Sequence, residues 1–190
     1  MPARVDRESR RRDVAEAVWR VLENSGFAGL SMRSVAAEMG ATTGLVTHWF
    51  GTKEELLDHA LQLLHERTDA SLGEHVSLRD RLVAVLPTTD EGRELSRIWV
   101  GFWGLALVDG GLSAREAARY ERWRDWLRPH LPSETAVDLV TSSVHGLVVQ
   151  TLFDPERFPV PRLEELLDAL LGAVLVRHPT VRSTPGPGRV

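Results

Sequence analysis

Residues 31–57 contain the pattern that most constrains the fold of this chain: two short helical segments separated by a tight turn. Ser31 is a favourable N-cap for a helix that buries three apolar side chains, Val35, Ala36 and Met39. Gly40 follows where that helix needs a left-handed C-terminal residue. Thr42 or Thr43 can then cap a second helix. Two helices around such a turn are typical of a helix-turn-helix motif, whose second helix enters the major groove of DNA.

The second helix of this motif has one apolar arc and one small polar arc. At about 100° per residue, the apolar arc holds Leu45, Val46, Trp49 and Phe50, and the opposite arc holds Thr43, Gly44, Thr47 and His48. Threonine offers a hydroxyl to base or phosphate oxygens and a methyl group to the thymine methyl, so the polar arc suits base edges. After it, Thr52–Glu55 forms a capping box that leaves Lys53 at a helix N-terminus, where a phosphate can bind.

These residues resemble the DNA-binding domain of the TetR family of repressors over residues 12–60. The resemblance is carried by Gly26-Phe-Ala-Gly-Leu-Ser-Met-Arg33 and by Gly40-Ala-Thr-Thr-Gly-Leu-Val-Thr-His-Trp-Phe-Gly-Thr-Lys-Glu-Glu-Leu56. Residues 43–50 are most similar to the BetI-like, choline-responsive branch, to which Ile98-Trp-Val-Gly-Phe-Trp103 is weakly similar. The resemblance implies DNA contacts at eight positions, which are Arg33, Thr42, Thr43, Gly44, Thr47, His48, Trp49 and Lys53.

Two of these positions depart from the family pattern, and several have an ordinary structural alternative. Many relatives have Tyr where Thr47 stands, and Tyr or His where Trp49 stands. Trp49 offers only its indole N–H to a phosphate and lies beside the apolar arc, so packing is its alternative role. His48, Arg33 and Lys53 could equally be solvated surface side chains.

Charge does not indicate a bulk basic domain. The formal net charge is −4 over 190 residues, and residues 1–60 hold eight basic against nine acidic side chains. Residues 1–12 alone are basic, with five Arg against Asp6 and Glu8. Two interpretations of this segment stay open: a flexible arm that contacts DNA, and a solvated disordered tail. We expect modest non-specific affinity for DNA and a shallow salt dependence for each protomer.

Composition and motif searches exclude several classes of protein. The absence of Cys excludes disulfides, thiolate zinc sites and cysteine catalysis. No apolar run approaches about 20 residues and no apolar stretch follows the Arg-rich start, so we expect a cytoplasmic protein without a membrane span or signal peptide. Gly-x-Ser-x-Gly, phosphate-loop and His-Glu-x-x-His patterns are missing. We therefore expect no catalytic activity, no cofactor and no metal.

Apolar spacings of three and four residues continue along the chain and predict an all-α protein of about nine helices. Asp90 is expected to cap the sixth helix, Ser113–Glu116 to form a capping box for the seventh, and Pro161 to stand first in the ninth. The expected organisation is an arm and helix-turn-helix unit over 1–52, a helical effector-binding and dimerisation domain over 53–178, and a disordered tail over 179–190.

Aromatic side chains concentrate in the predicted sixth and seventh helices. An indole-walled effector pocket is one interpretation, and an ordinary core is the other. Such a pocket would accept a flat apolar ligand or, through cation–π attraction, a quaternary ammonium. We therefore expect a small-molecule effector of aromatic or cationic character, with candidate pocket residues Trp99, Phe102, Trp103, Tyr120, Trp123 and His145.

The last two predicted helices carry more aliphatic residues than one buried face requires. Either they are central to the monomer or they meet a partner. A twofold homodimer fits the second alternative and would let two helix-turn-helix units read two half-sites. The resemblance implies the same dimer, and the candidate interface residues are Val140, Val144, Leu147, Leu167, Leu170, Leu171 and Val174.

These features together predict a repressor that leaves a palindromic double-stranded DNA operator when it binds an effector. The helix that begins at Lys53 is the expected mechanical link, because it runs from the DNA side into the helical body. The main alternative is a dimeric DNA-binding regulator that needs no ligand, for which a fully filled core would be evidence. A helical enzyme is a third and weaker alternative.

Overall fold

The computed structural model describes residues 2–73 and 77–175 of the chain. These residues form nine α-helices and two 3-10 turns, with no strand among them, which confirms the all-α prediction. The helices are α1 (Pro2–Ser25), α2 (Met32–Glu38), α3 (Thr43–Trp49), α4 (Lys53–Leu72), α5 (Leu78–Val85), α6 (Asp90–Ala106), α7 (Gly110–Leu127), α8 (Glu134–Phe153) and α9 (Val160–Leu175). The 3-10 turns are η1 (Phe27–Gly29) and η2 (Arg128–His130).

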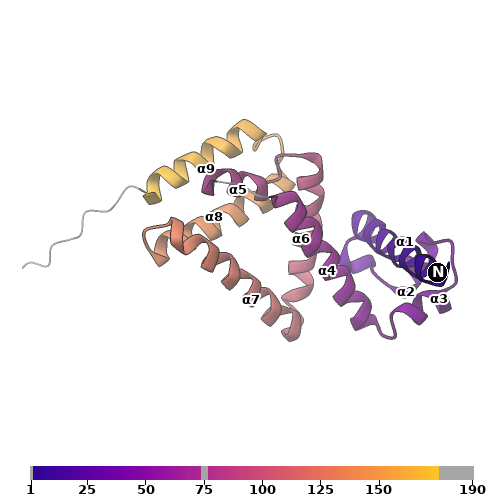
Figure 1. Ribbon diagram of the computed structural model, residues 1–190. Coiled ribbons are helices and arrows are strands. Elements are labelled where there is room, and N and C mark those ends of the chain that lie inside the picture. The colour runs from indigo at the N-terminus through magenta and orange to yellow at the C-terminus, as the bar shows by residue number, and fades with distance from the viewer. Residues whose placement is uncertain (1, 74–76, 176–190) are drawn as a thin grey trace, which may run out of the picture.

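One apolar core joins the helix-turn-helix to the rest of the molecule. Figure 1 shows α1, α2 and α3 grouped at one end, with α4 and α6 between them and the remaining helices. The core takes buried side chains from all five of these helices, including Val18, Val46, Leu64 and Phe102. Because close-packed side chains transmit displacement, a shift of α4 must also move α1, on which α2 packs, or disturb the packing of this core.

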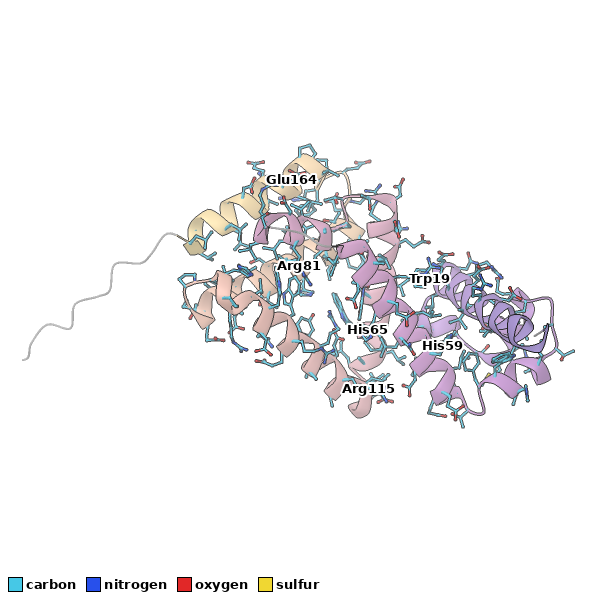
Figure 2. The ribbon with its side chains drawn as sticks, in the orientation of Figure 1. Trp19, His59, His65, Arg81, Arg115 and Glu164 are labelled. Atoms are coloured by element: carbon cyan, nitrogen blue, oxygen red, sulfur yellow. The ribbon has the colours of Figure 1, made fainter. Side chains whose placement is uncertain are left out.

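A second core lies at the opposite end, among α5, α8, α9 and the end of α7. Six of its residues are completely buried: Leu82, Leu127, Val140, Val144, Leu163 and Leu167. At its edge, Arg79 of α5 binds α9 through Asp168, with 2.6 Å between Nε and Oδ1, and through Glu164, with 3.1 Å between Nη2 and Oε2. Figure 2 shows Glu164 on α9. This core therefore fixes α8 against α9.

Two predicted helix caps are wrong. Thr89 caps α6 by accepting from the N–H of Gly92 at 2.9 Å, and Asp90 lies in the first turn instead. Asp109 caps α7 by accepting from the N–H of Leu112 at 2.9 Å, so Ser113 is inside the helix. The earlier start places the Leu112 side chain in the first core.

The N-terminal segment is helical where an arm or a tail was predicted. The backbone of residues 2–12 belongs to α1, so this segment is neither a flexible arm nor a disordered tail, and its contact with DNA remains a prediction. Pro2 is favourable at the first helical position, and the segment after it contains no Gly or Pro but several good helix formers. The predicted disordered tail, residues 179–190, lies outside the described residues.

By length and composition alone, α8 is apolar enough to cross a membrane, and within the described residues it is the one such helix. No helix apolar enough to span a membrane was predicted from the sequence. The acidic side chains of α8, Glu134 and Asp138, lie near one end, and the one other titratable side chain is His145. Seven of its residues are buried against neighbouring helices, which accounts for its apolar composition within the fold.

Candidate nucleic-acid interface and ligand cavity

Hydrogen bonds fix the turn between α2 and α3. Ser31 Oγ accepts from the N–H of Ser34 at 3.0 Å, and Ser34 Oγ accepts from the N–H of Ser31 at 2.9 Å. The predicted N-cap is therefore confirmed as half of a reciprocal capping box. Gly40 has a φ of 60°, and the N–H of Ala41 donates to the carbonyl of Ala36 at 2.9 Å. These features form a Schellman motif, which ends α2 and directs the chain into α3.

The polar arc of α3 is open to solvent. Thr42 occupies the N-cap position, but its side chain makes no capping bond. The Thr47 hydroxyl donates to the carbonyl of Thr43 at 3.0 Å, which leaves its methyl group and its remaining acceptor capacity for a ligand. Five of the predicted DNA-contact residues in this region are exposed: Thr42, Thr43, Gly44, Thr47 and His48.

The apolar arc of α3 packs as predicted except at Leu45. Val46 is completely buried and Phe50 is 8% exposed, whereas Leu45 is 36% exposed. The difference arises because α3 is only seven residues long and is covered mainly on the side of Val46. Trp49 is half-buried and packs against the first core, which gives it the packing role considered as an alternative. Its contact with DNA remains a prediction.

Two predicted cations stand at helix N-termini on either side of α3. Arg33 is the second residue of α2 and Lys53 is the first residue of α4, and both are exposed. Thr52 caps α4 by accepting from the N–H of Glu55 at 3.1 Å, and Glu55 Oε2 accepts from the N–H of Gly51 at 2.8 Å. In the predicted capping box the Glu55 side chain would accept from the N–H of Thr52, but it accepts from that of Gly51 instead. Both termini present free helix-end amides together with a cation, a combination suited to phosphate.

A cavity of about 100 Å³ lies among α4, α5, α6, α7 and α8. Four of the six predicted pocket residues line it: Trp99, Trp103, Trp123 and His145. Helix α4 contributes Thr68, Ser71 and Leu72, which the sequence analysis did not assign to a pocket. Within residues 2–73 and 77–175, no group of three or more His, Asp or Glu side chains is placed to hold a metal ion.

The other two predicted pocket residues, Phe102 and Tyr120, lie outside the cavity. Phe102 is 1% exposed, and its ring centroid is 5.2 Å from that of Phe27 in the first core. Tyr120 contacts the ring of His145 at 4.9 Å between centroids but does not line the cavity. The prediction failed because aromatic composition does not specify which side of a helix faces a cavity and which side faces another helix.

An ion pair that was not predicted from the sequence borders the cavity, and it joins the half-buried Arg119 to the buried Glu116. Arg119 binds Glu116 through Nε, 2.9 Å from Oε2, and through Nη2, 2.6 Å from Oε1. The indole N–H of Trp103 also donates to Glu116, at 2.8 Å, and Glu116 is only 9% exposed. The Arg119 guanidinium lies 4.3 Å from the ring centroid of Trp99. The i, i+3 spacing could have predicted the pair but not its burial.

Helix α4 connects the cavity to the helix-turn-helix core. The indole N–H of Trp99 donates to Thr68 Oγ1 at 2.8 Å, and the ring of His65 lies 5.3 Å from that of Trp99. Figure 2 shows His65 on α4, in the middle of the molecule. On another side of α4, the Arg67 guanidinium lies 4.1 Å from the ring centroid of Trp19 in α1. Helix α4 therefore contacts both the cavity wall and the DNA-binding end.

His145 is held neutral in the cavity wall. Its Nδ1 lies 2.7 Å from the carbonyl oxygen of Thr141. Because a carbonyl only accepts, Nδ1 carries the proton and Nε2 is left as an acceptor. Burial lowers the pKa of His145 below its usual 6.5, against a raising effect of the Thr141 bond, and the positive charge of Arg119 lowers it further. Burial likewise lowers the pKa of His65, again with a contribution from Arg119.

Acidification is expected to destabilise the protein through these histidines. In the unfolded chain both histidines take up a proton near pH 6.5, but in the folded chain they do so only at a lower pH. Their contribution to the free energy of unfolding is therefore complete above pH 6.5 and is lost as the pH falls towards their pKa in the folded state. The effect of His145 is at most about 1.4 kcal/mol per pH unit. Thermal unfolding between pH 7.5 and 5.5 should show a smaller loss of Tm in His145→Gln than in the parent. Equal losses would contradict the assignment of His145 as a group held neutral.

The outer faces of α8 and α9 carry accessible apolar and small residues. Four of the seven predicted interface residues belong to the monomer's own core and, at most 7% exposed, present almost no surface to a partner: Val140, Val144, Leu167 and Leu171. Their side chains fill the space between α8 and α9. The other three, Leu147, Leu170 and Val174, are half-buried. The exposed surface instead contains residues that the prediction omitted, namely Leu139, Phe153, Ala169 and Gly172.

Two protein families match separate segments of the chain. Residues 14–60 match bacterial regulatory proteins of the tetR family, and this segment includes the helix-turn-helix. Residues 76–176 match the BetI-type transcriptional repressor, C-terminal family, and this segment includes α5 to α9.

Individual proteins and solved structures are also similar to this chain. The HTH-type transcriptional regulator PksA of Bacillus subtilis (strain 168) is 28% identical over 186 residues, covering 88% of this chain and 90% of PksA. A transcriptional regulator from Rhodococcus sp. Rha1 has a TM-score of 0.76 at 26% identity, covering 86% of this chain and 95% of that one. A regulator from Saccharomonospora viridis in complex with choline has a TM-score of 0.69 at 20% identity, covering 90% of this chain and all of that one (100%), and shows a shared fold.

The family matches extend over more than half of the chain and agree with the local geometry of the helix-turn-helix. They confirm the family resemblance carried by residues 26–56, including its BetI-like character. The chain belongs to the TetR family of DNA-binding transcriptional regulators and has a C-terminal domain of the BetI type.

Proposed function

We propose that two copies of this chain form a repressor that binds a palindromic operator through α3 of each subunit and is released when a small molecule occupies the cavity beside α4. Family membership already establishes a DNA-binding transcriptional regulator. Beyond this, we propose which residues contact DNA, how two copies assemble and how a ligand controls DNA binding. A regulator of this kind acts on the chromosome and therefore in the bacterial cytoplasm.

For the DNA contacts, the support is the exposure of the polar arc together with the flanking cations. Base edges would meet Thr43, Gly44 and Thr47, which are small enough for close approach to the major groove. Phosphates would meet Arg33 and Lys53 at their helix N-termini, and also Thr42, His48 and the indole N–H of Trp49. Phosphate contacts would fix the register of α3 on the duplex, and the threonines would select the sequence.

For the homodimer, the support is the outer face of α8 and α9. Large apolar groups there are open to solvent, with Phe153 82% exposed and Leu139 50% exposed. Small residues lie between them, and a Cβ on Gly146 or Gly172 would meet no atom closer than 3.9 Å within the chain. Two such faces can pack closely around a twofold axis, with Leu147, Leu170 and Val174 as half-buried contributors. The same axis would pair two recognition helices.

For effector control, one observation carries the proposal: the cavity and the helix-turn-helix core share α4. Thr68, Ser71 and Leu72 line the cavity, while Leu56 and Leu64 of the same helix are buried in the first core. A ligand that displaces α4 would change the distance between the two recognition helices of a dimer. Operator and effector would then oppose each other by one coupling energy. In functional terms we divide the chain into 1–52 for DNA and 53–178 for effector binding and dimerisation.

The alternative of a ligand-independent regulator predicts a filled interior between α4 and α8. The cavity of about 100 Å³ at that place favours control by a ligand. No catalytic role is proposed, since the relatives that the chain matches are transcriptional regulators.

A cavity-filling variant tests effector control. Operator duplexes are first selected from random DNA with the parent protein, and a compound library is screened by tryptophan fluorescence. Compounds that bind should weaken operator affinity in an anisotropy titration, on the order of 150-fold for a coupling of about 3 kcal/mol. Ala84→Leu fills the cavity and should abolish both binding and release, whereas Ala118→Leu, on the exposed surface of α7, should abolish neither. Compounds that bind the parent without changing operator affinity would contradict the proposal.

A further inference from the structure

The side chains that border the cavity restrict the chemistry of its ligand. We propose that the cavity binds a small apolar monocarboxylate, whose carboxylate accepts hydrogen bonds from Arg119 and from the indole N–H of Trp123. This inference rests on the proposed function, because it assigns a ligand class to the effector cavity. It differs from the expectation drawn from aromatic composition, which included a cationic ligand.

Two hydrogen-bond donors at the cavity are available to an anion. Arg119 holds Glu116 through Nε and Nη2, and no bond within the described part of the chain uses its Nη1. Trp123 lines the cavity, and its Nε1 is buried without a hydrogen-bond partner among the described residues. A buried N–H without an acceptor is costly, and a ligand oxygen would remove that cost. A guanidinium and an indole N–H both donate, so the complementary group is an acceptor, and a carboxylate is the strongest available class.

The same surroundings disfavour a cation. The face of Trp99 that could attract an ammonium already carries the Arg119 guanidinium, 4.3 Å from the ring centroid. None of the described residues that line the cavity is acidic. The nearby carboxylate, Glu116, is already bound by Arg119 and by the indole N–H of Trp103. A cationic ligand would therefore lose its hydration without gaining a counterion and would be repelled by Arg119.

The remaining walls require a short hydrocarbon group with a single charge. Leu72, Val85, Leu95 and Val148 supply apolar surface. A cavity of about 150 Å³ accepts the six carbons of benzene, so the present volume of about 100 Å³ suits about four carbons, as in a small branched acid whose oxygens bind the two donors. His145, the other titratable group in the wall, is held neutral and offers its Nε2 as an acceptor. A dianion would thus meet no second cation among the described wall residues.

Three probes with one branched carbon skeleton test the charge: isobutyrate, isobutyramide and isobutylamine, with choline as a fourth. Binding to the full chain is followed by the indole N–H signals in two-dimensional NMR, in which Trp123→Phe identifies the Trp123 signal among the six tryptophans. Isobutyrate should shift the Trp123 signal downfield and bind at least about tenfold more tightly than isobutyramide, because a charged acceptor strengthens both hydrogen bonds. Isobutylamine and choline should not bind.

Two variants separate the ligand contacts from a structural role. Arg119→Met should weaken isobutyrate at least about tenfold and admit isobutylamine, because Glu116 then lacks its cation. The matched control Arg122→Met, exposed on the same helix, should bind as the parent does. Trp123→Phe keeps a six-membered aromatic ring but removes the N–H, so it should weaken isobutyrate, and its circular dichroism spectrum should match the parent's.

The outcomes distinguish this inference from the proposed function. Tighter binding of isobutylamine or choline than of isobutyrate to the parent, unchanged isobutyrate binding in Arg119→Met, or no binding by any probe would overturn the ligand class. Operator affinity is measured in the same samples. Isobutyrate binding that leaves operator affinity unchanged would count against effector control and not against the carboxylate site.

Discussion

Replacing Thr47 with glutamate is expected to lower operator affinity at least about a hundredfold. Thr47 is exposed on the polar arc of α3, and its hydroxyl donates to the carbonyl of Thr43, so its methyl group and free acceptor capacity are open to solvent and, in the proposed complex, would face the duplex. A glutamate there would remove these contacts and bring a negative charge towards the phosphates. A loss of about 1.4 kcal/mol at each of two half-sites multiplies to the stated factor. Fluorescence anisotropy on the selected operator measures it.

A glutamate placed elsewhere separates this effect from net charge and folding. Ala118 is exposed on α7, outside α3, α8 and α9, so Ala118→Glu should bind the operator as the parent does. Both variants should unfold at the parent's Tm by circular dichroism, because neither side chain is buried. An operator affinity for Thr47→Glu within threefold of the parent's would exclude α3 as the recognition helix.

Replacing Gly146 with glutamate is expected to raise the dimer dissociation constant at least about a hundredfold and to abolish operator binding with it. Gly146 lies on the outer face of α8, where a Cβ would approach only Gln150 Nε2, at 3.9 Å, so the monomer can accommodate a side chain. At a packed twofold interface the same side chain would bury an unpaired charge and overpack the contact. These costs together come to about 3 kcal/mol. Sedimentation equilibrium measures the change in assembly.

A matched glycine on another helix serves as the control. Gly104 is exposed on α6, and a Cβ there would meet nothing within 4 Å, so Gly104→Glu should remain dimeric. Replacing glycine inside a helix generally stabilises the monomer, so Gly104→Glu should be at least as stable as the parent. Gly146→Glu should lose only the stabilisation that comes from dimerisation and should remain a folded, helical monomer by circular dichroism. A Gly146→Glu protein that dimerises with the parent's dissociation constant would show that the subunits meet through another face.

Sequence reasoning succeeded where short-range interactions decide the structure. The Ser31 cap and the left-handed Gly40 depend on residues within one helical turn, and both appear as predicted. The same reasoning failed for α7, where Ser113 was predicted to form the cap and Asp109, four residues earlier, forms it instead. Burial of Leu112 accompanies the earlier start, and that contact with distant residues is not encoded in the local pattern.

The residues that line the candidate cavity could likewise be predicted only in part. Aromatic composition led to Trp99 and Trp103, which line the cavity, but equally to Phe102, which packs on Phe27. It gave no indication of Arg119, whose guanidinium covers the face of Trp99 and reverses the expected charge of the ligand. A charge next to an aromatic ring in space need not be next to it in sequence, so only the packing of α6 against α7 revealed it.

The amino-acid order alone determined the helical class, the helix-turn-helix and the identity of its exposed polar arc, because periodicity and capping act over a few residues. Tertiary structure decided which aliphatic residues of α8 and α9 are core and which are accessible, where the cavity lies, and that α4 joins it to the DNA-binding end. An apolar residue contributes the same burial energy against any apolar neighbour, so the pattern specifies that it is buried but not by which neighbour.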